Sequence, residues 1–578
     1  MIHRLKVVKA AGKRRLLLLS IVCFLMLIFS SLLLLWLLPW PELDSFLERQ
    51  HSSRFYDREG ELVYILSLEE GLRREWTDLE KIPKDLTETF IRSEDKNFYK
   101  HCGIDIFALT RALFQNASSG KRISGASTIT MQLSRMVRPR TVFPVTIRVK
   151  LTEMINSLRL ELKLNKKEIL ELYLNSIPFG YQTEGVTSAA RNFFGKNLLE
   201  LSEREREVLS LIPRNPSSYS YLLKETRMYE YPNKLPHFMQ WIIPQNKKGF
   251  DSDVYLSVNL RLNDLALSDI QNKIREYEDA RISSGSAFAI NNKTGEILVW
   301  VGNENFSDPD TGYVDGVIAK NQSGSTMKPF LYAMALERGF SPNTILPDIP
   351  MDFGTSKVYV PQNFNNRYNG PQLLRTCLAS SLNIPAVYLL YRIGIDSFYS
   401  RLLSLGFNSL EGKRDSMGLS LALGSGEITL FELVRAFSVF ARDGILPSLT
   451  GTKTTSVIID EKQIYEKDTA RIICNILGDS NARSLGFGFA KVFDTPYASI
   501  FKTGTANQYQ DILALGSTPS YTVGVWMGNI SGETVISETG SSIPAQVVRL
   551  ILDELEKAQS SSSGFQKPES YTKQKICA

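Results

Sequence analysis

Histidine and cysteine are scarce in this sequence, and their scarcity excludes several kinds of catalytic and metal site. The 578 residues include four histidines and five cysteines. The cysteines form no CxxC pair and no cluster with histidine, so their spacing predicts no structural zinc site. Their positions are Cys23, Cys102, Cys377, Cys474 and Cys577. The histidines stand at positions 3, 51, 101 and 237, so a Ser-His-Asp triad is excluded in the C-terminal half of the chain.

The body of the chain also lacks net charge. Lys and Arg total 67 and Asp and Glu total 61, a formal charge of +6. Six of the cations lie in residues 1–15 without any acidic residue, so the rest of the chain balances to zero. Nucleic-acid-binding domains are usually basic throughout the fold, so we expect no nucleic acid as partner. A hydrophobic content of 43% excludes an intrinsically disordered chain, and the length predicts about three domains.

One long apolar run is present, at residues 16–38. Its 23 residues carry no charge and would span roughly 35 Å as a helix, enough to cross a bilayer. A cleavable signal peptide has a shorter apolar run, about 7–15 residues, and a small-x-small cleavage site. Here Pro39 to Glu42 follow instead. We therefore expect an uncleaved transmembrane anchor, a cytoplasmic tail at 1–15 and export of residues 42–578 across the plasma membrane.

Hydrophobic periodicity divides the exported part into a helical region and a mixed region. Residues 80–215 repeat apolar residues at spacings of three and four, the pattern of amphipathic helices. Beyond about residue 255, strand-like alternation and helical runs occur together, which predicts a domain with both helices and a sheet. The expected strands are a pair in 52–72, a hairpin at 287–300, and runs at 498–504 and 512–528, and the expected helices are 326–338, 372–392 and 429–442. Residues 217–254 show no clear period, as in a linker, and the polar tail 558–578 is predicted to be disordered.

The helical region carries five short motifs in a fixed order. Glu94 and Asp95 open the pattern EDxxFxxHxGxD, and residues 125–133 read GASTITMQL. Lys150 and Glu153 form KxxE, and two further motifs follow at 171–196 and 212–219. Taken one at a time, an acidic pair, a run of hydroxyls and a Lys/Glu pair are typical of helix caps and surface ion pairs.

Together these motifs resemble the bacterial peptidoglycan glycosyltransferase domain. Its pattern is EDxxFxxHxGxD, GxSTxTxQL, KxxE, ELYLNxxxxGxxxxGVxxAAxxxFGK and IPxxPxxY, and all five parts occur here in order over about 125 residues. Chance agreement at this level is negligible. The resemblance implies a mainly helical, lysozyme-like fold and the polymerisation of a lipid-linked disaccharide.

The resemblance also implies roles for named residues. Glu94 is the expected base for the acceptor hydroxyl, and a partly desolvated carboxylate suits that task. The pyrophosphate leaving group needs positive charge more than a general acid, and Arg135, Arg148 and Lys150 are its expected source. Glu153 is expected either to orient Lys150 or to bind a divalent ion, Mg2+ or Mn2+. Displacement in one step would invert the anomeric configuration. The other motif residues expected to bind substrate are Asp95, Phe98, His101, Ser127, Thr128 and Gln132.

Two positions depart from the usual pattern of the family. It often has Gln where this chain has Met131, and Lys where this chain has Arg135. Met131 with Gln132, together with residues 175–180, is closer to the penicillin-binding protein 1C branch. That branch usually carries a further β-rich C-terminal domain.

Two other segments bear on membrane contact and on that further domain. Pro568 and residues 576–577 resemble the beginning of the C-terminal extension. Residues 136–145 mix apolar and basic side chains. This mixture is typical either of a segment that lies on an anionic membrane surface or of an ordinary loop, and the sequence favours neither.

The mixed region carries a second set of motifs. Ser325 and Lys328 form an SxxK tetrad, residues 381–383 read SLN, and residues 502–505 read KTGT. A single SxxK is common by chance, but the three together resemble the transpeptidase domain of penicillin-binding proteins. The surrounding stretches GSTMKPF, SSLNIPAV and ALGSGEIT match the same pattern. With the first domain, the resemblance covers most of the chain and implies a bifunctional class A penicillin-binding protein.

The chemistry of the second set needs a base other than histidine. A serine hydroxyl is a poor nucleophile until its proton is removed. Lys328 lies one helical turn after Ser325, so its amine can reach the hydroxyl, and burial with nearby cations would lower its pKa. By resemblance, Ser381 relays protons, Asn383 holds the peptide stem and Lys502 supplies positive potential. The residues expected to bind the end of the peptide and its carboxylate are Thr503, Gly504 and Thr505. The backbone N–H groups of Ser325 and Thr505 are expected to form the oxyanion hole.

These inferences predict a multidomain protein: an N-terminal transmembrane helix, a mainly α lysozyme-like glycosyltransferase domain and an α/β penicillin-binding and β-lactamase-like transpeptidase domain. The predicted boundaries are 1–15 for the cytoplasmic tail, 16–38 for the anchor, 50–220 for the first domain, 221–254 for a linker, 255–557 for the second domain and 558–578 for the tail. The expected partners are lipid II, nascent peptidoglycan, the membrane and other cell-wall synthesis proteins, with β-lactams as inhibitors.

Two other functions stay open at this point. One is a lytic glycosidase that uses the same lysozyme-like cleft, against which the KxxE motif argues. The other is a cell-wall sensor, or a glycan polymerase whose second domain is a weakly active or non-catalytic β-lactam or peptide-binding module. The intact first domain argues against a sensor for the whole chain but leaves the weak module open.

Overall fold

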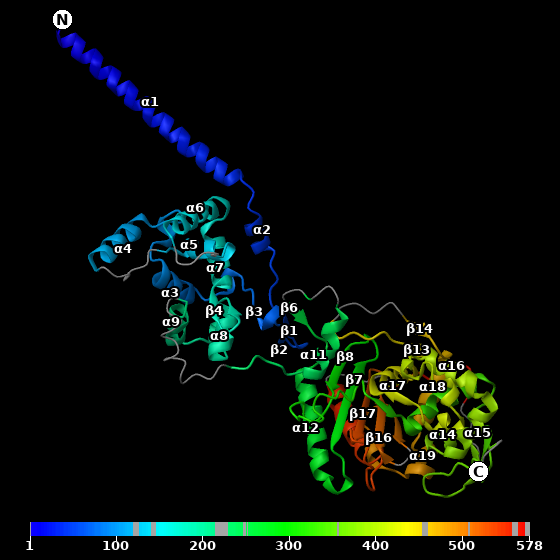
Figure 1. The fold of residues 1–578 in the computed structure, drawn as a ribbon. Coiled ribbons are helices and arrows are strands. Elements are labelled where there is room, and N and C mark those ends of the chain that lie inside the picture. Colours follow the sequence, from blue (N-terminus) through cyan, green and yellow to red (C-terminus); the bar gives the residue numbers. More distant parts are fainter. Residues whose placement is uncertain are drawn as a thin grey trace. The chain divides into compact units, whose positions relative to one another are not determined.

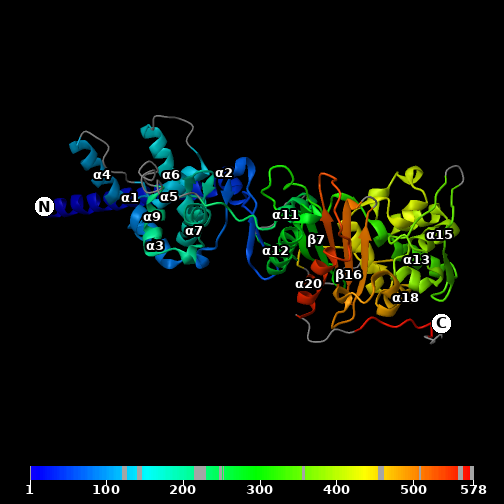
Figure 2. The ribbon, with the colours of Figure 1, turned by 90° about the horizontal axis from the view of Figure 1, so that it is seen from below.

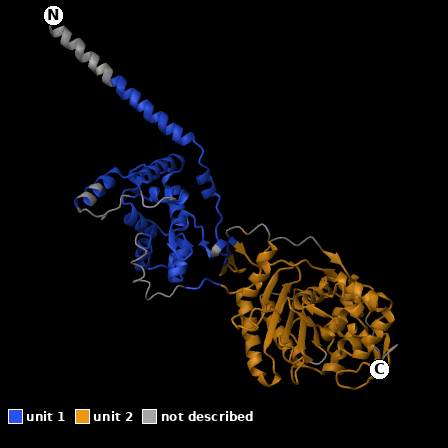
Figure 3. Cartoon of the chain, viewed as in Figure 1, with its two compact units in different colours: residues 1–54, 65–232, 251–253 blue, residues 55–64, 233–250, 254–578 orange. Residues whose placement is uncertain are grey.

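In the computed structural model, the described part of the chain comprises residues 2–119, 127–139, 146–213, 229–246, 250, 253–354, 358–453, 461–506, 509–557 and 564–572. The chain divides into two units, coloured blue and orange in Figure 3. Unit 1 consists of residues 1–54, 65–232 and 251–253, and unit 2 of residues 55–64, 233–250 and 254–578. Each unit has a hydrophobic core formed by its own residues.

The apolar run of the sequence forms most of a long helix, α1 (Ile2–Leu37), at the blue end of the ribbon in Figure 1. Residues 18–37 are long and apolar enough to cross a membrane, and this segment is not buried inside the protein. A helix that exposes apolar side chains on all sides is suited to lipid, where its backbone groups are already paired. The structure therefore fits the predicted anchor at 16–38.

Unit 1 is built from helices and one small sheet. At its centre, α5 (Ile129–Val137) packs against α6 (Ile147–Lys163) and α7 (Lys166–Ser176). The buried residues Ile129, Leu133 and Val137 are spaced four apart, which places them on one face of α5. The other helices are α2 (Pro41–Leu47), α3 (Lys84–Glu94), α4 (Ile106–Ser119), α8 (Val186–Phe194) and α9 (Glu203–Leu211). The strands, in the order β3-β5-β4, are β3 (Arg73–Arg74), β5 (Thr183–Glu184) and β4 (Pro178–Gly180).

Two motif positions of unit 1 hold the fold together. Asn175, at the end of the ELYLN motif, donates from Nδ2 to the carbonyl oxygen of Thr77 (2.8 Å) and accepts from the N–H of Thr77 at Oδ1 (2.9 Å). Gly185 has φ +80°, and a Cβ at this position would lie 2.9 Å from the carbonyl oxygen of Asn175. Glycine alone fits such a backbone conformation and such a close approach. These motif residues therefore fix the end of α7.

Helix α6 is fastened to the end of the anchor helix. Arg159 donates from Nη2 to the carbonyl oxygens of Leu38 (3.1 Å) and Pro39 (3.2 Å). Its guanidinium also lies 4.5 Å from the ring centre of Trp40, a cation–π contact. Four-residue steps along α6 from Arg159 lead to three exposed apolar residues in one row, which turns about 40° around the helix at each step. They are Ile155, Leu151 and Ile147.

A five-stranded antiparallel sheet forms the centre of unit 2. Its strand order is β15-β16-β17-β7-β8, so the last strands of the chain pair with the hairpin that opens the domain. The strands are β7 (Ser284–Asn291), β8 (Ile297–Val301), β15 (Ile500–Thr505), β16 (Asp511–Ser517) and β17 (Tyr521–Gly528). The inner strands are buried on both faces, which explains their continuous apolar sequences.

Helices cover both faces of this sheet (Figure 2). On one face lie α12 (Leu260–Glu276) and α20 (Pro544–Lys557), and on the other lies α17 (Leu430–Phe437), whose Phe431 packs against Phe288 of β7. The further helices are α11 (Pro236–Ile242), α13 (Lys328–Glu337), α14 (Leu374–Ala379), α15 (Asn383–Ile393), α16 (Ile395–Ser404), α18 (Lys467–Leu477) and α19 (Ser480–Phe487).

Four small sheets complete unit 2. Three of them are antiparallel pairs: β9 (Lys320–Gln322) with β12 (Glu427–Thr429), β10 (Ile345–Asp348) with β11 (Gly370–Leu373), and β13 (Ile445–Leu446) with β14 (Lys462–Gln463). The fourth, most of whose residues belong to unit 2, has the order β2-β1-β6, from β1 (Arg54–Tyr56), β2 (Leu62–Ile65) and β6 (Asp253–Tyr255). This last sheet confirms the strand pair that the sequence predicts in 52–72.

The other predicted elements of unit 2 are confirmed with one exception. The hairpin at 287–300 is β7 and β8, and the runs at 498–504 and 512–528 are β15, β16 and β17. The helix predicted over 372–392 is wrong as a single element, because α14 ends at Ala379 and α15 begins at Asn383. The break falls at residues 380–382, which include two serines, and Pro385 in the first turn of α15 is a helix-start signal that the apolar periodicity does not reveal.

Two segments predicted to lack structure are ordered in part. Within the predicted linker 221–254, α11 buries Phe238 and stacks Trp241 on Trp300 (4.7 Å between ring centres), which joins it to unit 2. Within the predicted disordered tail, the N–H groups of Glu569 and Ser570 donate to the Asp468 carboxylate on α18 (2.8 and 2.6 Å). Both predictions are corrected for these residues. Residues 140–145, 216, 219 and 576–577, named in the sequence analysis, lie outside the described part of the chain.

Candidate active sites

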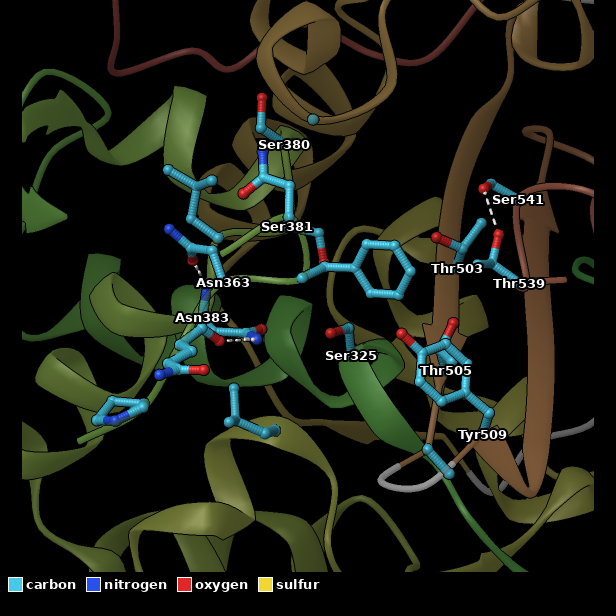
Figure 4. A pocket seen from close by; sticks show the side chains of 18 of the residues that line it. Ser325, Asn363, Ser380, Ser381, Asn383, Thr503, Thr505, Tyr509, Thr539 and Ser541 are labelled. Atoms are coloured by element: carbon cyan, nitrogen blue, oxygen red, sulfur yellow. Dashed lines mark hydrogen bonds between the residues drawn. The ribbon is translucent and has the colours of Figure 1, made fainter. Parts of the chain in front are cut away.

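Unit 2 contains a pocket of about 580 Å3 beside the edge strand β15 (Figure 4). All three motifs of the mixed region reach it. Ser325 comes from the 3-10 turn η7 (Gly324–Met327) just before α13, Ser381 and Asn383 from the break before α15, and Thr503 and Thr505 from β15. The structure therefore brings together side chains that are up to 180 residues apart in sequence.

Glycines allow η7 and β15 to approach each other at the nucleophile. Gly324 has φ +53°, and a Cβ at this position would lie 2.6 Å from the carbonyl oxygen of Thr505. A Cβ at Gly504 would lie 2.5 Å from the carbonyl oxygen of Ser323. Contacts this short are not tolerated, so both positions require glycine. Gly504 is not among the residues that line the pocket; it seats β15 against η7, and its predicted contact with substrate stays a prediction.

Two buried lysines converge on the hydroxyl of Ser381. Lys328 donates from Nζ to Ser381 Oγ (3.3 Å), to the Ser381 carbonyl oxygen (2.6 Å) and to Asn383 Oδ1 (2.7 Å). Lys502 donates from Nζ to Ser381 Oγ (2.9 Å) and to the Thr503 carbonyl oxygen (2.8 Å). Among the described residues, the amine of Lys328 donates to Ser381 and Asn383 and not to Ser325. The predicted direct contact with Ser325 is thus not formed in this state.

The backbone at Ser381 is strained. Its φ is +58°, a left-handed conformation that non-glycine residues seldom adopt. This conformation costs about 1–3 kcal/mol and persists only where the surroundings enforce it, which is typical of functional sites. Here it turns both the hydroxyl and the carbonyl oxygen of Ser381 toward Lys328.

Burial shifts the pKa values of both lysines. It lowers the pKa of Lys502 to about 7, because a charged amine loses its hydration inside the protein. The pKa of Lys328 is lowered well below its ordinary value by burial first, and by the positive charge of Lys502 second. A neutral amine near physiological pH is what a lysine needs to act as a general base.

Several residues that line the pocket lie outside the motifs. Asn363, Phe364 and Tyr509 come from connecting segments, Phe487 from the end of α19, and Thr539 from the segment before α20. Sequence analysis missed them because these segments have no hydrophobic period and no motif. Tyr509, with φ +57°, stacks edge-on against Phe364 across the pocket (5.9 Å between ring centres).

In unit 1, one carboxylate oxygen of Glu94 accepts a hydrogen bond, and the other has no hydrogen-bond partner among the described residues. Glu94 is the last residue of α3, and Gln132 of α5 donates from Nε2 to its Oε2 (2.8 Å). The Tyr173 hydroxyl donates to Gln132 Oε1 (3.4 Å), which fixes the direction of the amide. The other oxygen, Glu94 Oε1, is buried without a hydrogen-bond partner among the described residues. A buried acceptor without a partner is rare and calls for a functional explanation.

A second cluster in unit 1 joins α5 and α6. Lys150 donates from Nζ to Glu153 Oε2 (3.0 Å) and to Ser127 Oγ (3.1 Å), and Arg135 lies 3.8 Å from Glu153 Oε1. Glu153 is 5% exposed, so its charge is shared by two cations inside the fold. The structure thus brings these four predicted site residues together. Arg148, also predicted, lies exposed in the first turn of α6.

Other predicted substrate-binding residues of unit 1 are engaged within the fold. The Asp95 carboxylate accepts from His101 Nε2 (3.0 Å) and from the N–H of Ile129 at the start of α5 (3.0 Å). Thr128 caps α5 through its side chain, and Phe98 is fully buried in the core. Asp95 and Thr128 thus shape the start of α5 and Phe98 packs in the core, and substrate binding by these three residues stays a prediction.

The donor set of unit 1 does not fit a resident divalent ion. No three residues among His, Cys, Asp and Glu in the described ranges are grouped so that they could hold a metal. Glu153, the predicted ligand, is already paired with two cations. Mg2+ prefers several oxygen ligands without competing cations. We therefore derive no step through Mg2+ or Mn2+.

Two family models match the chain, one on each half. The transglycosylase model matches residues 60–239, and the penicillin binding protein transpeptidase domain model matches residues 285–553. The chain belongs to the class A penicillin-binding proteins. The predicted resemblance and fold class are confirmed.

Individual relatives agree with this family. The chain is 28% identical to penicillin-binding protein 1C of Escherichia coli (strain K12), over 90% of this chain and 70% of the relative. It is 29% identical to penicillin-binding protein 4 of Bacillus subtilis (strain 168), over 82% and 87%. The crystal structure of penicillin-binding protein 1A from Haemophilus influenzae has a similar fold, with a TM-score of 0.59 and 18% identity over 90% of this chain and 94% of that chain.

As a class A penicillin-binding protein, the chain is a peptidoglycan glycosyltransferase and a D-Ala-D-Ala transpeptidase. It takes part in peptidoglycan synthesis, and its apolar N-terminal helix fits membrane anchoring. The predicted enzyme class is confirmed, and the lytic glycosidase and sensor alternatives are set aside for the chain as a whole.

The lowered lysine pKa values predict the pH dependence of acylation. If Lys328 is the base, the acylation rate rises with pH through the Lys328 pKa, so it reaches its full value well below pH 10.5. Above about pH 7, Lys502 loses its charge, and the affinity for a carboxylate-bearing β-lactam falls. Stopped-flow acylation from about pH 5 to pH 10 separates the two effects. A rate that keeps rising up to the ordinary lysine pKa would contradict the assignment.

Proposed function

We propose that unit 1 polymerises lipid II into glycan strands with Glu94 as the general base. Oε1 of Glu94 supports this role most directly, because it is a buried acceptor without a hydrogen-bond partner among the described residues. An acceptor-sugar hydroxyl that donates to Glu94 Oε1 would complete this oxygen's hydrogen bonding. Gln132 holds the other oxygen, so the carboxylate cannot rotate away.

The leaving side of the same reaction is proposed to use the cations of α5 and α6. Attack on the anomeric carbon breaks its bond to the diphosphate, and undecaprenyl diphosphate leaves with inverted configuration at the sugar. Lys150 and Arg135 carry positive charge beside Glu153, and exposed Arg148 lies on the same helix as Lys150. Glu153 orients both cations, so positive charge is in place before negative charge develops on the leaving group.

The proposed base predicts a separation of the two activities. Glu94→Gln keeps the size and the hydrogen bond to Gln132 but cannot accept a proton, so glycan polymerisation should fall by about 10²–10⁴-fold. Binding of a fluorescent penicillin should stay unchanged, because Ser325 lies in the other unit. Polymerisation is measured with labelled lipid II on a gel of glycan chains. Glu88→Gln, at an exposed position of the same helix, is the matched control. Near wild-type polymerisation by Glu94→Gln would refute the role.

We also propose that unit 2 cross-links stem peptides through an acyl-enzyme on Ser325. The Ser325 oxygen bonds to the carbonyl carbon of the penultimate D-Ala, the peptide bond to the last D-Ala breaks, and free D-Ala leaves. The amine of a neighbouring stem peptide then attacks the ester and restores Ser325. Lys328 takes the serine proton, and Ser381, held between Lys328 and Lys502, passes a proton to the leaving amine.

The remaining groups of the pocket are proposed to hold the peptide. Asn383 contacts the stem, Thr503 and Thr505 bind the terminal carboxylate beside the charge of Lys502, and both threonines line the pocket. The N–H groups of Ser325 and Thr505 stabilise the oxyanion, an interaction worth about 10²–10³-fold in rate. A β-lactam mimics the terminal dipeptide and acylates the same serine.

The acyl-enzyme predicts one site of β-lactam attachment. Mass spectrometry of the treated protein should show one adduct, on the peptide that contains Ser325, and none in Ser325→Ala. Lys328→Ala should also lose the adduct, because the second unit has no catalytic histidine to replace it. Ser416→Ala, an exposed serine outside the pocket, is the control. If several β-lactams and a thioester substrate leave Ser325 unmodified in a protein that still polymerises glycan, unit 2 is a binding module.

The orientation in the membrane is proposed from the charges that flank the anchor. Six cations precede the apolar helix, and cationic flanks stay on the cytoplasmic side. Residues beyond 42 then lie outside the plasma membrane, where lipid II is polymerised. This places the protein in the bacterial inner membrane as a single-pass protein with extracytoplasmic catalytic units.

The proposed orientation predicts which parts a protease can reach. Protease added to spheroplasts should digest the two catalytic units, while a tag fused before residue 15 should be cut only after the membrane is permeabilised. Immunoblots with antibodies to the tag and to unit 2 follow each part. Protection of unit 2 in intact spheroplasts would invert the assigned topology.

A further inference from the structure

A buried carboxylate lies behind the transpeptidase pocket, and the mechanism above gives it no role. Asp348, the last residue of β10, is fully buried. Its two oxygens accept from Asn363 Nδ2 (2.7 and 3.0 Å), and one of them also accepts from the N–H and Nδ2 of Asn369 (2.9 and 2.6 Å). A buried charge is costly unless it is satisfied in this way. Its retention so close to the active site therefore calls for an explanation.

Asp348 fixes the direction of the Asn363 side chain. A carboxamide donates from nitrogen and accepts at oxygen, so a partner on one side decides what the other side can do. Because Asp348 and the carbonyl oxygen of Arg367 (2.8 Å) both accept from the Nδ2 of Asn363, the Oδ1 must point away from the carboxylate. That oxygen accepts the backbone N–H of Asn383 (2.8 Å), a contact visible in Figure 4.

Asn383 is oriented in the same manner. Its Nδ2 donates to the carbonyl oxygen of Gln362 (2.7 Å), which leaves its Oδ1 to accept from Lys328 Nζ (2.7 Å). Two consecutive residues thus hold Asn383: Asn363 accepts from its backbone N–H, and Gln362 accepts from its side chain. The chain of hydrogen bonds runs from Asp348 through Asn363 and Asn383 to the amine of Lys328. Asp348 sets the direction of the Asn363 amide, Asn363 holds the backbone of Asn383, and the Gln362 carbonyl oxygen sets the direction of the Asn383 amide.

We propose that Asp348 and Asn363 are positioning residues of the transpeptidase, which orient Asn383 and thereby place the amine of Lys328 for its work on Ser325. The inference rests on the proposed acyl-enzyme mechanism. Asp348 lies outside the pocket, while Asn363 lines it and acts on Lys328 through its hydrogen bond to Asn383. The geometry gives this network a direct effect on the rate of acylation, because a base misplaced by about 1 Å can cost 10²-fold in rate.

The experiment measures acylation in two parts, on the full-length protein. Stopped-flow reaction with a fluorescent penicillin yields the affinity of the initial complex and the rate constant of acylation. Asn363→Ala and Asp348→Asn should lower the rate constant by about 10–100-fold and change the affinity by less than about threefold. Asp352→Asn is the matched control. It alters an exposed carboxylate in the segment after β10 that, among the described residues, accepts from the N–H groups of Gly354 and Tyr359.

A reciprocal variant tests orientation rather than bulk. In Asp348→Asn/Asn363→Asp the amide and the carboxylate exchange places, so the residue at 363 still offers an acceptor to the N–H of Asn383 while the residue at 348 now donates. The double variant should recover at least about tenfold of the lost acylation rate. No recovery, together with a lowered melting temperature of unit 2 in the single variants, would show that the network only supports the fold.

Two further outcomes are distinguishable. An unchanged acylation rate constant in Asn363→Ala would overturn the positioning role even if Lys328→Ala is inactive, and the proposed mechanism would survive. An unchanged rate in Lys328→Ala would overturn the mechanism itself, and the positioning role with it. Glycan polymerisation by the same preparations shows that unit 1 is intact in every variant.

Discussion

Two amines buried around one hydroxyl form the constraint on which the second unit depends. Lys328 and Lys502 both donate to Ser381 Oγ, and the burial of both lowers their pKa values. Two ammonium groups so close in a dry interior would repel each other strongly, so the fold favours states in which at least one is neutral. The close approach at Gly324 and Gly504 and the strained φ of Ser381 hold this arrangement in place. A protein optimised for stability alone would avoid it.

The proposed bases of the two units are prepared in opposite ways. In unit 2, burial first and the positive charge of Lys502 second lower the pKa of the Lys328 amine. In unit 1, Lys150 and Arg135 lie beside Glu153. Glu94, by contrast, has one oxygen that accepts from Gln132 and one without a partner among the described residues. Glu153, which is paired with cations, is suited to position them. Glu94, which has no cation partner in these contacts, is suited to take a proton. The proposed roles of the two glutamates thus follow from the partners of each side chain, because the residue type is the same.

The sequence was informative wherever function needs a fixed spacing. SxxK, SLN and KTGT named the lysines and serines that the fold brings together, and KxxE named a pair that is bonded in the structure. The motifs could not separate residues that face a substrate from residues that shape the site. Phe98 and Gly504 belong to motifs but have packing roles. A motif contains the residues that the local fold requires as well as the residues that contact substrate.

What the sequence could not predict depends on contacts between irregular segments. Asn363 reaches Asn383 from a connecting segment without hydrophobic period, and Asp348 is one acid among 61 acidic residues. The break between α14 and α15 lies in a stretch of mostly apolar residues, and its signal is local: two serines at 380–381 and Pro385 in the first turn of α15. The strained conformation of Ser381 becomes evident only when its partners are placed around it.

The attachment of Arg159 to the end of the anchor has a consequence for where glycan synthesis takes place. At 100° per residue, Lys150 lies on the side of α6 opposite to Arg159. The body of α6, about 10 Å in diameter, therefore separates the residue bonded to the end of the anchor from the Lys150–Glu153 pair. Helix α6 thus acts as a spacer inside unit 1, and its thickness contributes to the distance between the anchor and the proposed diphosphate site.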